Sequence, residues 1–176
     1  MSHFLQTIIA RTGVAARAAR GWTEGVTVPL VQGYAALPIT YGLHNELVAK
    51  LEPIESDLIP PDLLYWRDGS VLAFVADASR HGDVVYVETD YFGGAGWQAA
   101  VYAHAGQITQ FYKTSDMPED GPGPDSDRAI NQALHRLGVT IGKQDEFDTI
   151  GLGRYRTTLA LALDGHGHTE PPAPAD

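Results

Sequence analysis

Residues 84–98 decide the fold of this chain and read Val84-Val85-Tyr86-Val87-Glu88-Thr89-Asp90-Tyr91-Phe92-Gly93-Gly94-Ala95-Gly96-Trp97-Gln98. The β-branched and aromatic residues of the first half are typical of a strand. Glycines 93, 94 and 96 provide the positive φ angles that a tight connection requires, and a second extended run follows them. The pattern predicts a β-hairpin.

A third strand is predicted directly after the hairpin. His104-Ala105-Gly106 is a turn signal, and the residues from Gln107 to Lys113 are again extended. Three consecutive strands with short links form an antiparallel meander. We therefore expect a meander over about residues 84–113.

Helical patterns flank this block of strands. Apolar residues recur at helical spacing in segments 43–51, which Thr40 would cap, 70–80 and 128–138. Strands in one contiguous block with helices on either side favour the α+β class. The expected architecture is α+β, an antiparallel β-meander packed on one face by these three helices.

Three regions are expected along the chain. Residues 1–22 are interpreted as an N-terminal amphipathic helix or extension, with the helix itself over 3–20, and residues 23–163 as a single α+β domain. Alternation of apolar and polar residues predicts a closing strand over 154–163. The Gly, His and Pro residues of 164–176 are typical of a disordered tail.

Composition excludes several classes of function. The chain has 176 residues, a net charge of -10 and no cysteine, so disulfides, thiolate zinc sites and cysteine nucleophiles are excluded. The acidic balance disfavours nucleic acid and anionic membrane surfaces and favours a basic protein partner. No apolar run approaches the roughly 20 residues of a membrane-spanning helix. We expect a cytoplasmic protein.

Two carboxylates lie in the first strand of the hairpin. Glu88 and Asp90 are two residues apart, so they share one face of the strand with Tyr86. A carboxylate pair can perform acid–base chemistry or bind a divalent cation. It can also belong to a solvated face or to a partner-binding face. The solvated face is the simplest interpretation, because an antiparallel meander with one face in water carries polar residues at every second position.

The familiar catalytic motifs are absent from the sequence. Gly93-Gly94-Ala95-Gly96 lacks the Lys-Ser/Thr ending of a phosphate loop and precedes an extended run rather than a helix. The seven histidines are scattered, apart from His166 and His168 near the end of the chain. We therefore expect no catalytic residue, no resident metal ion and no cofactor.

Residues 145–156 are the second segment dense in functional groups and read Asp145-Glu146-Phe147-Asp148-Thr149-Ile150-Gly151-Leu152-Gly153-Arg154-Tyr155-Arg156. The acids occupy the first turn of a short predicted helix, where the helix dipole favours them. The two arginines could pair with these acids or contact an anion or a partner.

Three segments together resemble a family of small, acidic, uncharacterised bacterial proteins. They are VYVETDYFGGxGxQAA at 85–100, AINQALxxLGV at 129–139 and DEFDxIGLGRYR at 145–156, and the similar region runs from about Leu37 to Arg156. The resemblance implies no particular reaction. Its acidic character is similar to that of immunity proteins of bacterial toxin systems, by analogy.

These observations favour a non-enzymatic protein-binding module over an enzyme. The most concrete form is an immunity-like antitoxin that occludes a cationic toxin. Two alternatives stay open, a small enzyme that uses the Glu88 and Asp90 pair near the Gly93–Gly96 turn, and a structural or phage-associated accessory subunit. The expected partner-binding residues are Glu88, Asp90, Tyr91, Phe92, Trp97, Asp145, Glu146 and Asp148.

Overall fold

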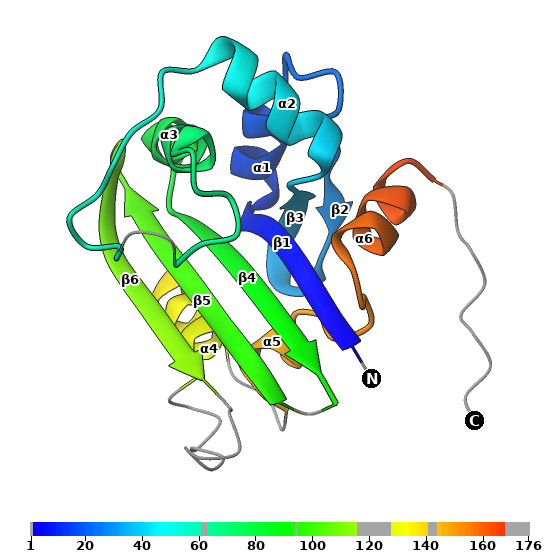
Figure 1. Ribbon diagram of the computed structural model, residues 1–176. Helices are drawn as coiled ribbons and strands as arrows, with labels where there is room; N and C mark the ends of the chain where they lie inside the picture. Colours follow the sequence, from blue (N-terminus) through cyan, green and yellow to red (C-terminus); the bar gives the residue numbers. More distant parts are fainter. Residues whose placement is uncertain (1, 61–62, 94, 116–127, 141–143, 168–176) are drawn as a thin grey trace.

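One six-stranded antiparallel sheet organises the molecule (Figure 1). The computed structural model describes residues 2–60, 63–93, 95–115, 128–140 and 144–167. The strand order is β2-β3-β1-β4-β5-β6. The strands are β1 (Ser2–Arg11), β2 (Val28–Pro29), β3 (Tyr34–Pro38), β4 (Val84–Phe92), β5 (Ala95–His104) and β6 (Gln107–Ser115).

The predicted meander is confirmed as β4, β5 and β6. Phe92 and Ala95 are Cα partners, so the hairpin turn lies between these two residues. Gly93 has a φ of 64°, in the left-handed region that a tight hairpin connection uses. Gly93 therefore serves the turn, as the sequence predicted, whereas Gly96 lies within β5, where it pairs with Tyr91.

The N-terminal segment is a strand, and the prediction of a helix over 3–20 is wrong. β1 lies between β3 and β4, and α1 (Thr12–Ala19) begins only after it. Leu5, Ile8 and Ile9 are fully buried on both faces of the sheet. A strand covered on both faces shows an apolar run without strict alternation, and such a short run resembles one face of a helix.

Helices cover both faces of the sheet. On one face, α1, α2 (Tyr41–Lys50) and α3 (Ser70–Ala78) pack on side chains that include Val84 and Tyr86. On the other face, α4 (Ala129–Leu137) and α6 (Thr158–Gly165) pack on side chains that include Val85 and Val87. The α+β class with a meander is confirmed, and α2 and α3 share a face as expected.

The position of α4 differs from the expectation, because it packs on the face opposite to α2 and α3. Residues 84–87 of β4 are apolar at every position and all are buried. A strand of this kind needs cover on both faces. This requirement explains why the three predicted helices divide between the two sides.

The C-terminal prediction of a strand over 154–163 is also wrong, because α6 occupies Thr158–Gly165. Thr157 caps the helix, and its hydroxyl accepts a hydrogen bond from the Ala160 N–H at 3.1 Å. Leu161 and Ala162 then lie on the buried side. The cap explains why the alternating pattern of Tyr155, Thr157 and Leu159 did not extend into a strand. Most of the predicted tail, residues 168–176, lies outside the described residues.

Two smaller predictions of helices are confirmed. Thr40 caps α2 by accepting a hydrogen bond from the Leu43 N–H at 3.1 Å. Asp145 caps the short helix α5 (Glu146–Thr149) in the same way, through the Asp148 N–H at 2.7 Å. Within the part of the chain that the structure describes, no helix has both the length and the apolar character needed to cross a bilayer.

Candidate functional site

The residues predicted to bind a partner lie on both faces of the sheet. The even-numbered residues of β4, Glu88 and Asp90, point to the face of α2 and α3, and Trp97 lies beside Asp90 on β5. Tyr91 points to the opposite face, where it lines a small pocket with Asp145. The structure therefore does not gather these residues into one surface. The other three are Phe92, 81% exposed at the end of β4, Glu146, which is buried, and Asp148, which is exposed.

An exposed aromatic surface surrounds Asp90. Phe4 of β1 and Trp97 of β5 are the Cα partners of Asp90 on its two sides. Three further aromatic side chains extend this group, and their exposed fractions are high for their size. We define the aromatic surface as Phe4, Tyr41, Tyr65, Asp90, Phe92 and Trp97, in which Tyr41 is 65%, Tyr65 37% and Phe92 81% exposed.

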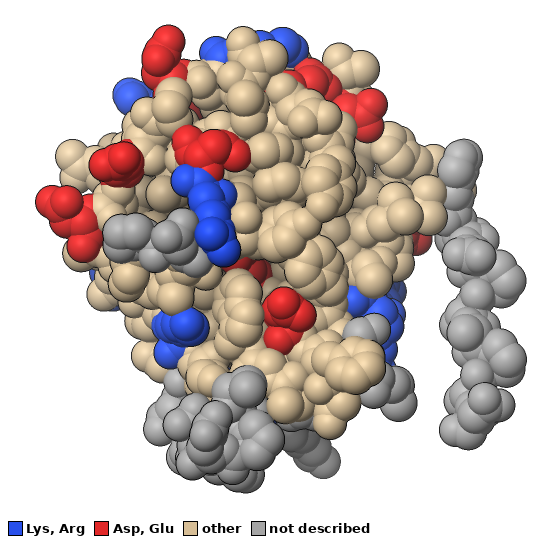
Figure 2. All heavy atoms as spheres, in the orientation of Figure 1, with Lys and Arg blue, Asp and Glu red and all other residues tan. Residues whose placement is uncertain are grey.

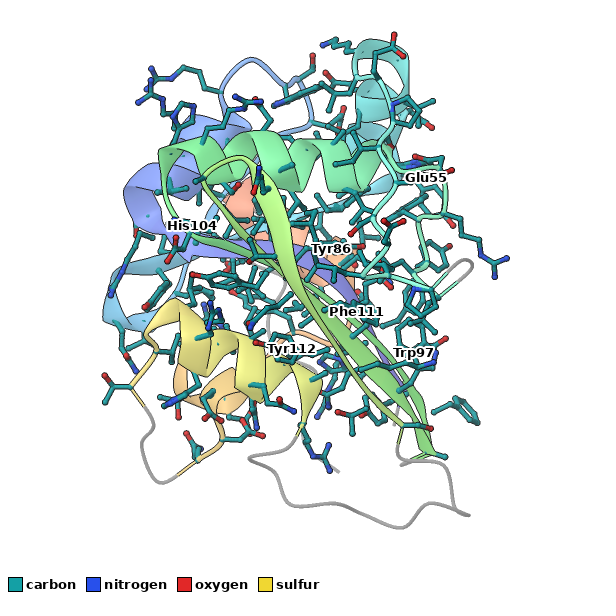
Figure 3. The ribbon with its side chains drawn as sticks, turned by 90° about the vertical axis from the view of Figure 1, so that its left-hand side faces the viewer. Glu55, Tyr86, Trp97, His104, Phe111 and Tyr112 are labelled. Atoms are coloured by element: carbon teal, nitrogen blue, oxygen red, sulfur yellow. The ribbon has the colours of Figure 1, made fainter. Side chains whose placement is uncertain are left out.

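Direct contacts hold part of this surface together. The rings of Phe4 and Tyr65 meet edge to face with centroids 5.0 Å apart. The hydroxyls of Tyr65 and Tyr41 are 2.5 Å apart and share a hydrogen bond. Figure 3 shows Trp97 and Phe111 on one side of the sheet and Tyr112 on the other, beside α4. The aromatic groups therefore lie on the face that carries α2 and α3.

Sequence reasoning missed Phe4, Tyr41 and Tyr65. Phe4 belongs to the strand that was predicted as a helix, and Tyr65 lies in a segment without a clear periodic pattern. Their proximity to Asp90 depends on β1 pairing with β4 and on the path of the loop between α2 and α3. Neither is visible in local spacing. A Tyr-Trp pair at 65–66 inside a polar loop was the one available signal.

Glu88 lies beneath this surface and is 1% exposed. Its carboxylate accepts hydrogen bonds from the Tyr65 N–H, at 2.9 and 3.2 Å to its two oxygens, and from the Tyr86 hydroxyl at 2.5 Å. Burial raises the pKa of Glu88 to about 7, although hydrogen bonds from Tyr86 and from the backbone of Tyr65 and Trp66 lower it. Glu88 therefore fastens the loop that carries Tyr65 to the sheet.

A second polar contact fastens the same loop to α2. His44 Nε2 lies 2.5 Å from Asp68 Oδ2, and the His44 ring stacks on Trp66 with centroids 3.8 Å apart. The Ser70 N–H donates to the other oxygen of Asp68 at 2.9 Å. The loop is thus tied at Tyr65 and at Asp68, which fixes the position of the Tyr65 ring.

The three segments that carried the family resemblance meet at a small polar pocket on the opposite face. The pocket has a volume of about 130 Å³. The Gln98 amide oxygen accepts from the Ile130 N–H at 2.9 Å, and its NH₂ group donates to the Tyr91 hydroxyl at 3.1 Å. Asn131 accepts from the Phe147 N–H at 3.3 Å. The pocket is lined by His3, Thr89, Tyr91, Gln98, Arg128, Ile130, Asn131, Asp145 and Phe147.

These hydrogen bonds attach α4 and α5 to the sheet, and Gln98 is the central group. We expect Gln98→Ala to lower the free energy of unfolding by about 2 kcal/mol, because the buried Ile130 N–H would lose its acceptor. Urea denaturation monitored by circular dichroism would measure this loss. Gln107→Ala on the edge strand β6, where the exposed Gln107 side chain makes no hydrogen bond with any described residue, is the matched control. Equal stability of the two variants would contradict a structural role for Gln98.

The charge of the described surface is less acidic than the whole sequence suggests. The described residues hold 14 of the 22 acidic and 11 of the 12 basic residues. Figure 2 shows a face covered mostly by uncharged side chains, with charged groups scattered over it. Five of the other acids lie at 116–127, which directly follow β6 in the sequence. Among the described residues, no three His, Asp or Glu side chains are grouped as a metal site would require.

Comparison of the chain with protein-family models, with curated proteins and with solved structures finds no match. The resemblance carried by the three segments stays an expectation. Function is therefore argued from the geometry of the chain itself.

Proposed function

We propose that the protein is a non-enzymatic binding module and that the aromatic surface contacts its protein partner. The observation that carries this proposal is the exposure of Phe92, Tyr41 and Tyr65 around the exposed carboxylate of Asp90. Large aromatic side chains supply much of the binding free energy at protein interfaces. Neighbouring exposed apolar groups of this kind mark interaction sites more often than single ones do.

A basic partner fits this surface best. Asp90 offers a carboxylate between Phe4 and Trp97, an arrangement that suits a lysine or arginine side chain through an ion pair and through cation–π contacts. Lys113 lies 5.8 Å from the Trp97 ring centroid, so that ring already accommodates a cation. Ser115, the Cα partner of Trp97, directly precedes the acidic run at 116–127 in the sequence. A cationic toxin, held by occlusion, is the partner class that we propose.

Glu88 has a supporting role in this proposal. It is buried beneath Tyr65, whereas Asp90 is exposed, so the two carboxylates do not present themselves together to a substrate. The hydrogen bond that Glu88 accepts from the Tyr65 N–H holds the loop and thereby the aromatic side chain. Preorganised side chains lose less entropy on binding.

The experiment uses the tagged full-length chain to capture proteins from the native host. Phe92→Ala is expected to reduce recovery of its basic partner about thirtyfold, the effect of losing one aromatic hot spot. Asp90→Asn should weaken binding less and flatten its dependence on salt.

The matched control is Val31→Ala, which truncates another exposed apolar residue that lies near Ile150, away from the aromatic surface. If the Phe92→Ala variant recovered as much of the partner as wild type and the Val31→Ala variant do, the proposed surface would be refuted. A partner without an excess of basic residues would refute the electrostatic part alone.

A further inference from the structure

A pocket lies within the long loop that joins α2 to α3. The chain runs from Leu51 to Gly69 with no helix or strand among its described residues, and in Figure 1 it swings out toward β6 before it returns to α3. Loops of this length without secondary structure are uncommon in compact domains and often serve a function. The loop encloses a pocket of about 740 Å³, within the range of small-molecule sites.

Contacts at both ends of the loop hold the pocket open. The Ile54 N–H donates to the Gly69 carbonyl at 3.3 Å. Gly69 has a φ of 78°, and a Cβ there would lie 2.4 Å from the Ile54 carbonyl oxygen, so this close approach requires glycine. Asp68 is bound to His44, and Tyr65 to Glu88. The two arms of the loop are therefore fixed relative to α2, α3 and the sheet.

The walls of the pocket combine apolar and polar surface in similar parts. Both arms of the loop contribute to them, together with one residue of α3, and Leu58 is 49% exposed at this site. Burial of an apolar body against such walls is favourable by about 25 cal/mol per Å². The apolar lining residues are Pro53, Ile54, Leu58, Ile59, Pro60, Leu63, Leu64, Trp66 and Leu72.

The charged lining residues make the rim of the pocket negative overall. Glu55 and Asp57 lie on one arm, are exposed, and make no hydrogen bond or ion pair with any described residue. Figure 3 shows Glu55 on the same side of the sheet as Trp97 and Phe111. Asp68 and Arg67 lie on the other arm, and each is engaged in interactions of its own. Glu55 and Asp57 therefore offer two carboxylates, beside apolar side chains, to a positively charged ligand.

We propose that this loop pocket binds a small organic cation with an apolar body, such as a primary amine that carries an aryl or alkyl group. The apolar part packs against the leucines and Trp66. The ammonium group lies at Glu55 and Asp57. This site adjoins the aromatic surface through Trp66, whose ring meets those of Tyr41 and Tyr65 edge to face. Its charged rim lies outside that surface and does not depend on the proposed protein partner.

Three phenylalkyl probes of similar length test the proposal. They are 4-phenylbutylamine, 4-phenylbutanol and 4-phenylbutyrate, which differ in the charge of the head group, and isothermal titration calorimetry at low salt measures their affinities. The amine is expected to bind about tenfold more tightly than the alcohol, because two carboxylates attract its charge. The carboxylate should bind more weakly than the alcohol.

Variants of the rim locate the site. Glu55→Gln combined with Asp57→Asn should lower the affinity of the amine to that of the alcohol and leave the alcohol unchanged. Asp77→Asn, which neutralises an exposed acid of α3 outside the pocket lining, is the matched control and should change neither. Leu58→Ser should weaken both probes, since it removes part of the apolar wall.

Two results would overturn the proposal. One is an amine that binds no better than the butyrate. The other is an affinity for the amine that survives in the double variant, because the charge would then be recognised elsewhere. The capture of a protein partner should be the same for wild type and the double variant, so failure of this site and failure of the aromatic surface are distinguishable.

Discussion

We expect Glu88→Gln to stabilise the protein relative to wild type as the pH rises. The free energy of unfolding of the variant minus that of wild type should increase by about 2 kcal/mol between pH 5 and pH 8. Burial raises the pKa of Glu88 from 4.5 to about 7, so folding at pH 8 must bury a charge or retain a proton that the unfolded chain has lost. Glutamine carries no charge in either state. Its amide oxygen can still accept from the Tyr65 N–H, and its NH₂ group can donate to the Tyr86 hydroxyl.

The sign of the pH dependence follows from the raised pKa. Between pH 4.5 and 7 the folded state binds more protons at Glu88 than the unfolded state does, so the free energy of unfolding falls as the pH rises. The stabilising contribution of the protonated group is complete below pH 4.5 and is lost as the pH passes 7. Above that range the contribution of Glu88 becomes constant.

Guanidinium denaturation at pH 5, 6, 7 and 8 would measure this difference. Other ionisable groups contribute equally to wild type and variant, so their effects cancel in the comparison. Asp90→Asn, on the same strand face but exposed, is the matched control for replacing a carboxylate with an amide. A Glu88→Gln difference that stays constant from pH 5 to 8 would mean that Glu88 is ionised in the folded protein across this range.

Gly96→Ala is expected to lower the free energy of unfolding by about 3 kcal/mol or more. A Cβ at this position would lie 2.1 Å from the Asp90 carbonyl oxygen and 2.7 Å from the Tyr91 Cα, both in the paired strand. Backbone atoms of a central strand cannot move away cheaply, so the hairpin must distort. Urea denaturation would measure the loss.

Gly93→Asn is the informative control for this prediction. Gly93 has a φ of 64°, and no atom lies within 4 Å of an added Cβ. Asparagine tolerates the left-handed region, so this variant should stay within about 1 kcal/mol of wild type. Comparable losses in both variants would show that turn conformation, rather than the approach of the two strands, sets the requirement for glycine.

The sequence predicted those parts of the fold that local patterns determine. Residues 84–113 contain β-branched and aromatic runs separated by turn residues, a pattern typical of an antiparallel meander, and they form β4, β5 and β6. The cap at Thr40 was recognisable because a hydroxyl precedes an apolar periodic run. The prediction failed for β1, where Leu5, Ile8 and Ile9 are buried on both faces and their spacing no longer distinguishes a strand from a helix.

The candidate site was less predictable than the fold, because it depends on contacts between distant segments. Asp90, Phe92 and Trp97 were recognised within the hairpin, but Phe4 and Tyr65 join them through long-range pairing. Glu88 was expected at a partner surface because it shares a face with Asp90. The loop residue Tyr65 covers it, and no local pattern in the sequence indicates that cover.

The central position of β1 has a consequence for the order in which the fold is completed. Ser2 pairs with Phe92 and Thr7 with Pro38, so β1 joins β2 and β3 to the meander. During synthesis this strand leaves the ribosome before either of its neighbours, and its partners in β4 follow 74 to 90 residues later, from Ala10↔Val84 to Ser2↔Phe92. The apolar side chains of β1 therefore stay exposed until β4 has been synthesised and can pair with it. Such long-range pairing slows folding. Chaperone dependence of nascent chains cut short before residue 84 would reveal this delay.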